Sequence, residues 1–251
     1  LTNVNGTLFF AAYDDTYGWE LWKSNGTEAG TGLVKDIYPG VGSSDPDKLT
    51  DVNGTLFFVA DDGTNGRELW KSDGTEVGTG LVKDIYPGAS GSSFSYLTNV
   101  NGTLFFSASD GTNGTELWKS DGTEAGTVMV KDIYPGAESS NPEFLTKVNG
   151  TLFFRANNDT NGIELWKSDG TEANTVMVKD IKPGGSGSSI YYLTDLNGTL
   201  FFSADDGTHG DKLWKSDGTE AGTVMVSGVS SWPSELKNVN GTLYFKAYIL
   251  G

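Results

Sequence analysis

The chain is built from one sequence unit that returns several times. The segment Leu1–Phe10 (LTNVNGTLFF) recurs in closely similar form from Leu49, Leu97, Leu145 and Leu193, 48 residues apart each time. A last copy begins early, at Leu236. A repeat of this length is typically one supersecondary structure that buries its apolar face only against its neighbours. The repeats are 1–48, 49–96, 97–144, 145–192 and 193–235, with a half repeat at 236–251.

Each full repeat contains four strand-like segments separated by turn formers. In the third repeat these segments, here called A to D, are 97–100, 103–108, 116–119 and 128–133. Asn101-Gly102 separates A from B, and Asn-Gly between apolar runs predicts a type I′ hairpin because both residues tolerate positive φ. No helical period appears, and Gly or Pro interrupts the chain about every ten residues.

Four antiparallel strands in a repeat of this length predict an all-β fold, a β-propeller of four-stranded blades, as one domain over residues 1–251. The fifth D segment is degenerate (224–229), and Leu236–Tyr248 supplies only another A and B. The ring therefore has five or six positions. The half repeat either packs beside the first repeat, or is surplus, or awaits a C–D pair from elsewhere, which would favour self-assembly through the half repeat. The apolar Tyr248-Ile249-Leu250 is expected to be buried.

The composition excludes several functions. A net charge of −16 and a pI near 4.3 disfavour a nucleic-acid partner, because phosphate binding needs a basic surface. No apolar run approaches the length of a membrane span, so no membrane insertion is expected. The first residues have no signal-peptide pattern. The absence of cysteine removes any disulfide framework.

The C segment and its turn carry a recognisable motif, Glu-Leu-Trp-Lys-Ser-Asp-Gly-Thr, complete at 68–75, 116–123 and 164–171. It departs from this form at Asn25 in the first repeat and at Lys212 in the fifth. The motif resembles the ELWxxDGT repeat family of bacterial proteins, and the resemblance covers nearly the whole chain. It implies a secreted or surface-exposed protein and carries over no catalytic activity.

Paired carboxylates in the B–C links are the candidate metal ligands. Asp61-Asp62 and Asp205-Asp206 are proposed as Ca²⁺ ligands, because adjacent carboxylates repel each other and gain from a cation. Asp14-Asp15 is a similar pair. The alternative is a set of solvated acidic loops, since no complete calcium loop with a trailing Glu is present. No other cofactor is expected.

Two further columns of residues have a functional and a structural interpretation. The tryptophans could be sugar-stacking platforms, but each follows a Leu on the opposite face of its strand, which favours a core between blades. The aspartates of Asp-Gly-Thr could bind Ca²⁺, but Asp before Gly is typical of a turn. The tryptophans are Trp22, Trp70, Trp118, Trp166 and Trp214, and the aspartates are Asp73, Asp121, Asp169 and Asp217.

Near-identical repeats argue against a single catalytic centre. A glycosidase needs two carboxylates in different environments, whereas repetition gives each acid the same environment. His209, the one histidine, replaces an Asn of the other repeats and is interpreted as a surface substitution. We therefore expect a non-catalytic extracellular or cell-surface module for binding or adhesion, lectin-like with repeated weak sites, whose partner is a surface glycan or an extracellular protein. The alternative is a structural scaffold or filament subunit, and a glycoside hydrolase comes last. Ligands should contact the variable D–A and B–C loops.

Overall fold

The computed structural model describes residues 1–229 and 231–248, and this part of the chain is all-β with no helix. Consequently it contains no helix that could cross a membrane. The strands are β1 (Thr2–Val4), β2 (Thr7–Asp14), β3 (Gly18–Ser24), β4 (Gly32–Lys35), β5 (Asp47–Val52), β6 (Thr55–Asp61), β7 (Arg67–Ser72), β8 (Gly80–Lys83), β9 (Ser95–Val100), β10 (Thr103–Ser109) and β11 (Thr115–Ser120). They continue as β12 (Val128–Lys131), β13 (Glu143–Val148), β14 (Thr151–Asn158), β15 (Gly162–Ser168), β16 (Val176–Lys179), β17 (Tyr191–Leu196), β18 (Thr199–Asp205), β19 (Asp211–Ser216), β20 (Val224–Met225), β21 (Ser231–Val239) and β22 (Thr242–Tyr248).

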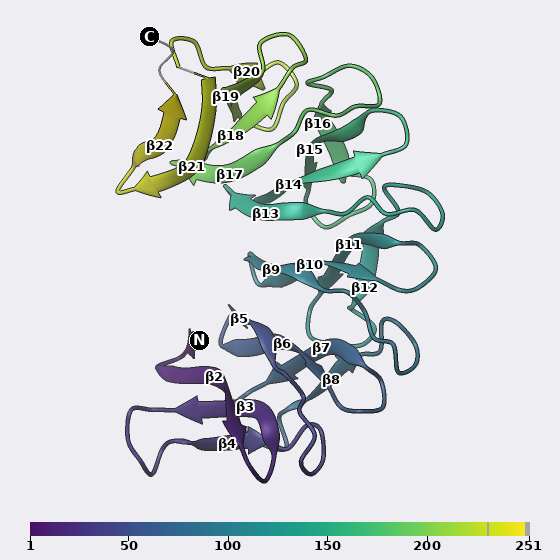
Figure 1. Ribbon diagram of the computed structural model, residues 1–251, viewed down its shortest axis with the longest axis vertical. Helices are drawn as coiled ribbons and strands as arrows, with labels where there is room; N and C mark the ends of the chain where they lie inside the picture. The colour runs from purple at the N-terminus through teal and green to yellow at the C-terminus, as the bar shows by residue number, and fades with distance from the viewer. Residues whose placement is uncertain (230, 249–251) are drawn as a thin grey trace. The chain divides into compact units, whose positions relative to one another are not determined.

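Every full repeat forms one four-stranded antiparallel sheet in which consecutive strands are neighbours (Figure 1). The sheets are β1–β4, β5–β8, β9–β12, β13–β16 and β17–β20, and the half repeat gives the two-stranded sheet β21–β22. The chain divides into two compact units, Leu1–Met129 and Val130–Gly251. The border between them falls within β12, so each unit is described by itself.

The Asn-Gly hairpins form as the sequence predicts. Asn101 and Gly102 have φ of 53° and 88°, and the Gly102 N–H donates to Oδ1 of Asn99 at 2.9 Å. The turn fixes the register, with Val100 opposite Thr103 and Thr98 opposite Phe105. The apolar side chains of each strand are therefore set on their faces before neighbouring sheets pack.

The core lies between consecutive sheets. In the first unit, Leu21 and Ile37 of the first repeat pack with Phe58 and Trp70 of the second. In the second unit, Leu165 of the fourth repeat packs with Trp214 of the fifth in the same way. Trp70, Trp118, Trp166 and Trp214 are all buried, so the interpretation as core residues is confirmed for these four, whereas Trp22 of the first repeat is only half-buried. Each fully buried large apolar side chain stabilises the fold by about 1.5–3 kcal/mol. A single sheet cannot bury these side chains, so this stabilisation comes from the packing of consecutive sheets against each other.

The structure corrects the expected ends of several strands. The third A strand, β9, starts at Ser95, two residues early, because a bulge at Tyr96 (φ 57°) lets the pairing continue past the expected start. The fifth D strand is only the two residues of β20. Tyr248 was expected to be buried, but it is 68% exposed in β22; Ile249 and Leu250 lie outside the described residues.

Candidate functional site

In the first, second and fourth repeats, a buried glutamate holds the connection between the D strand and the next A strand. Glu68, the first residue of the motif in the second repeat, is fully buried and accepts backbone N–H groups of Ile85 at 2.9 Å, Tyr86 at 3.0 Å and Ser92 at 3.1 Å. Glu164 does the same in the fourth repeat, with Ile181 N–H at 3.0 Å. One side chain thus satisfies several buried donors of a loop that has no sheet partner.

These glutamates are unusual acids. Burial raises the pKa of Glu68 and of Glu164 to about 7, although the N–H groups that they accept act in the opposite direction. Burial also raises the pKa of Glu20. The sequence interpretation gave this Glu no role. The sequence did contain a sign of this role: in four of the five full repeats a glutamate stands two residues before the Trp, within a strand that is otherwise apolar at this point.

Close backbone packing joins the B–C turn to the D–A loop of the same repeat. Gly66 has φ +67°, and a Cβ on it would lie 2.5 Å from the backbone nitrogen of Gly91. In the fourth repeat, a Cβ on Gly162 would lie 2.6 Å from the backbone nitrogen of Gly187. The two loops are therefore one rigid platform, and the side chains that vary on it are displayed at fixed positions.

The first pair of candidate calcium ligands makes hydrogen bonds inside its own turn. Asp61 Oδ1 accepts the Gly63 N–H at 2.7 Å, and Asp62 Oδ1 accepts the N–H groups of Thr64 and Asn65, both at 2.8 Å. Asp62 Oδ2 accepts the side-chain amide of Asn65 at 2.8 Å. These bonds favour the charged carboxylate and lower the pKa of Asp62 against the effect of its burial.

The second pair is engaged in the same way and also contacts the side chains of a histidine and a lysine. Asp206 Oδ2 lies 2.7 Å from Nδ1 of His209, whose contact helps lower the pKa of Asp206 to about 2 against the effect of burial. Asp205 Oδ2 accepts from Nζ of Lys182 at 3.1 Å. Over residues 1–229 and 231–248, no group of three or more His, Cys, Asp or Glu side chains is arranged to hold a metal ion. The Ca²⁺ assignment stays a prediction.

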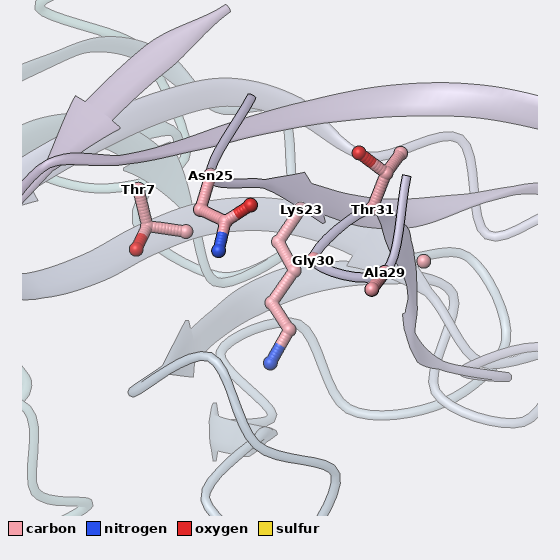
Figure 2. Close-up of a pocket in the computed structure, with 7 residues that line it drawn as sticks. Thr7, Lys23, Asn25, Ala29, Gly30 and Thr31 are labelled. Atoms are coloured by element: carbon pink, nitrogen blue, oxygen red, sulfur yellow. The ribbon is translucent and has the colours of Figure 1, made fainter. Parts of the chain in front are cut away.

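The Asp-Gly-Thr segments are turns, as their favoured interpretation holds. Asp73 Oδ1 accepts the N–H of Thr75 at 2.8 Å and its hydroxyl at 2.7 Å, and Gly74 has φ +90°. The Gly74 carbonyl accepts from Nζ of Lys23 in the preceding repeat at 2.7 Å. The motif thus closes its own turn, and the lysine of the preceding repeat fastens that turn to the preceding sheet. Figure 2 shows Lys23 and the corresponding loop of the first repeat, whose residues line a pocket.

The fourth repeat carries a cluster that the other repeats lack. The guanidinium of Arg155 lies 4.7 Å from the ring centre of Phe144 and 4.6 Å from that of Tyr191. Its Nε donates to Glu143 Oε2 at 2.8 Å, its Nη2 contacts the same oxygen, and its Nη1 donates to the Ile190 carbonyl at 2.9 Å. The corresponding residues of the other full repeats are Ala11, Val59, Ser107 and Ser203, and the half repeat has Lys246 at this position.

A cavity of about 170 Å³ opens beside this cluster. Tyr191, which packs against Arg155, and its neighbour Tyr192 lie at the start of β17. Each of these two side chains is 42% exposed, and their ring centres are 6.2 Å apart. The cavity is smaller than the roughly 300–1,000 Å³ of drug-sized sites, so its scale suits one small ring. Its lining residues are Ser140, Asn141, Glu143, Arg155, Asn157 and Ile163. Residue types alone did not reveal this site; the departure of Arg155 from its four counterparts was the available signal.

Comparisons with known proteins agree with the fold. No family model and no curated protein matches the chain. Among solved structures, it is similar to a prolyl endopeptidase (TM-score 0.52, 13% identity, 88% of this chain and 33% of that chain). It is also similar to oligopeptidase B from Leishmania major (TM-score 0.50, 12% identity, 90% and 33%). The matched parts are the β-propeller domains of these peptidases, and the chain spans about a third of their length.

Proposed function

We propose that this protein is a non-catalytic, lectin-like binding module that holds a neutral hexose ring in the cavity beside Arg155. The observation that carries the proposal is the Arg155 guanidinium, which packs against two aromatic rings in mutual contact and is paired with Glu143 at the wall of that cavity. Groups held in advance lose little entropy on binding.

The chemistry of the lining supports a neutral, hydroxyl-rich ligand. Arg155 and Glu143 neutralise each other, so the cavity has no free charge to attract an ion. The amides of Asn141 and Asn157 add donors and acceptors suited to hydroxyl groups. Outside the lining, the half-exposed ring of Tyr191 packs against Arg155 and adds an aromatic surface of the kind that packs against a pyranose.

The same lining supports a binding rather than a hydrolytic role. Glycoside hydrolysis ordinarily requires two carboxyl groups flanking the bond that breaks. Glu143 is the one carboxylate in the lining, and it is paired with Arg155. Location outside a bacterial cell rests on the resemblance to ELWxxDGT repeats. The sequence-based expectation was a weak site in every repeat. The proposal differs from it in placing a single site in the fourth repeat, where Arg155 lies.

A glycan array tests the proposal with variants taken from the chain itself. Arg155→Ser and Tyr191→Ser use the residues of the third repeat, Ser107 and Ser95, so the fold accepts them there. Both variants should lose binding to neutral glycans at least tenfold. The control Tyr96→Ser removes an exposed aromatic ring from the other compact unit and should bind as the parent does.

Two outcomes would reject the proposal. If the parent protein binds no neutral glycan, the structural-scaffold alternative is favoured. If Tyr96→Ser weakens binding as much as Tyr191→Ser, the ligand contacts the repeated positions and not the cavity beside Arg155.

A further inference from the structure

The B–C hairpin of the first repeat displays three aromatic rings that no other full repeat has. We call Tyr13, Tyr17 and Trp19 the aromatic tip; their exposed fractions are 58%, 36% and 46%. Tyr13 and Trp19 are cross-strand partners in β2 and β3, with ring centres 5.9 Å apart. The corresponding residues of the other full repeats are Asp61, Ser109, Asn157 and Asp205; Asn65, Asn113, Asn161 and His209; and Arg67, Thr115, Ile163 and Asp211. In the half repeat, Tyr248 corresponds to Tyr13.

The backbone under the aromatic tip is firmly held although its rings are exposed. The Trp19 carbonyl accepts the N–H of Ser44 at 3.0 Å, and the Trp19 N–H donates to Oγ of Ser43 at 3.0 Å. Gly18 packs against the Gly42 carbonyl with no space for a Cβ. Exposed tyrosine and tryptophan rings on such a support do not contribute to the core, and clusters of this kind are typical of contact surfaces.

The charge around the aromatic tip identifies the partner that fits. Asp14 and Asp15 form the turn between the rings, and the exposed Asp45 donates its backbone N–H to the Trp19 carbonyl at 3.3 Å. The whole chain has a net charge of −16. Aromatic faces beside carboxylates attract a cation, and arginine stacks on such rings more often than lysine.

We propose that the aromatic tip is a docking surface for an arginine-bearing segment of a partner protein. The guanidinium stacks on Trp19 and Tyr13, while the neighbouring carboxylates pair with its N–H groups. This surface lies in the first compact unit, whereas the glycan cavity lies in the second, and the two proposals are independent. Attraction between exposed charges should weaken as salt screens them.

Fluorescence anisotropy with labelled peptides tests the proposal on the full chain. The probes are a peptide of alternating arginine and glycine, and peptides of equal length with lysine or glutamine in place of arginine. The test variant is Tyr13→Asn, Tyr17→Asn, Trp19→Thr, whose new residues occur at these positions in the third or fourth repeat and leave the net charge unchanged. A second variant, Asp14→Asn with Asp15→Asn, keeps the rings and the fold of the turn.

The parent should bind the arginine peptide at least threefold more tightly than the lysine peptide, and the glutamine peptide not measurably. The aromatic variant should lose at least tenfold in affinity, and the Asp14/Asp15 variant at least threefold. The proposal is overturned if the aromatic variant binds the arginine peptide like the parent, because attraction to net charge alone then suffices. It is equally overturned if no peptide binds the parent protein. It is also overturned if the aromatic variant keeps its affinity for the arginine peptide and loses only the binding of neutral hexoses.

Discussion

Lys71 donates from Nζ to the backbone carbonyl of Gly122 at 2.7 Å, which links the strand of one repeat to the turn of the next. The same link joins Lys23 to Gly74 and Lys167 to Gly218. Because the lysine and the glycine belong to the same motif, each copy of the motif fastens itself to the following copy. Repetition of the sequence therefore produces repetition of the contact between sheets.

Replacing Lys71 with methionine tests the value of this link. The change keeps most of the apolar stem and removes the donor to the Gly122 carbonyl, so we expect a loss of about 1–2 kcal/mol in unfolding free energy. Urea denaturation measures it. Lys215→Met is the matched control, because Lys215 is exposed and its removal should cost less than about 0.5 kcal/mol. Equal losses in the two variants would contradict the account.

Glu68→Ala should be among the most damaging single changes in the chain. It leaves the N–H groups of Ile85 and Tyr86 without this acceptor, whereas the Ser92 N–H keeps its bond to the Arg67 carbonyl at 2.9 Å. Each unpaired buried donor costs about 1–3 kcal/mol. We expect a loss of at least about 3 kcal/mol in thermal or urea unfolding. Glu76→Ala, at an exposed glutamate of the same repeat, should change little. A small effect at Glu68 would show that the loop has other support.

Stability should fall as the pH rises from about 5 to 8. The folded protein holds the protons of Glu68 and Glu164 more tightly than the unfolded chain, because the pKa rises from 4.5 to about 7 on folding. This contribution is complete below about pH 4.5 and is lost as the pH passes through 7, at about 3 kcal/mol per glutamate. Unfolding free energies measured across this range test it. Glu164→Gln should reduce this dependence of stability on pH, because it removes one of the two glutamates. Glu172→Gln, at an exposed glutamate, should leave the dependence unchanged. A parent protein whose stability does not change over this pH range would refute the prediction.

The contact between the B–C turn and the D–A loop should not tolerate a methyl group. Gly91 has φ +65°, and a Cβ there would collide with the backbone of Arg67. We therefore expect Gly91→Ala to lower the melting temperature by several degrees, because strain and collision add. Gly80→Ala is the control: a Cβ there meets no atom within 4 Å, and the third repeat has Val128 at that position. Similar melting temperatures for the two variants would contradict the rigid platform.

Local patterns were enough to predict most of the strands. The Asn-Gly hairpins and the four-strand sheets follow from turn chemistry and alternation, and the burial of Trp70 follows from its place in the repeat. The bulge at Tyr96 and the shortness of β20 depend on packing between strands, which no local pattern encodes. Ring closure and the number of blades stay predictions.

The candidate site was harder to predict for a related reason. A repeat directs attention to what recurs, such as the Asp-Gly-Thr turn, whereas Arg155 and the aromatic tip occur once each. Glu143 and Arg155 are 12 residues apart and meet because β13 and β14 pair in a register that places them opposite each other. Comparing each repeat with the others, position by position, identifies the aromatic tip from sequence alone and would also have identified Arg155.

Isothermal titration of glucose, galactose and mannose into the parent protein and Arg155→Ser tests the central claim most directly. The account predicts that at least one of these neutral hexoses binds with a stoichiometry near one per chain and that Arg155→Ser weakens this binding at least tenfold. A stoichiometry near the number of repeats, with equal affinity in the variant, would place the ligand on the repeated surfaces and contradict the account. So would the absence of heat from all three hexoses.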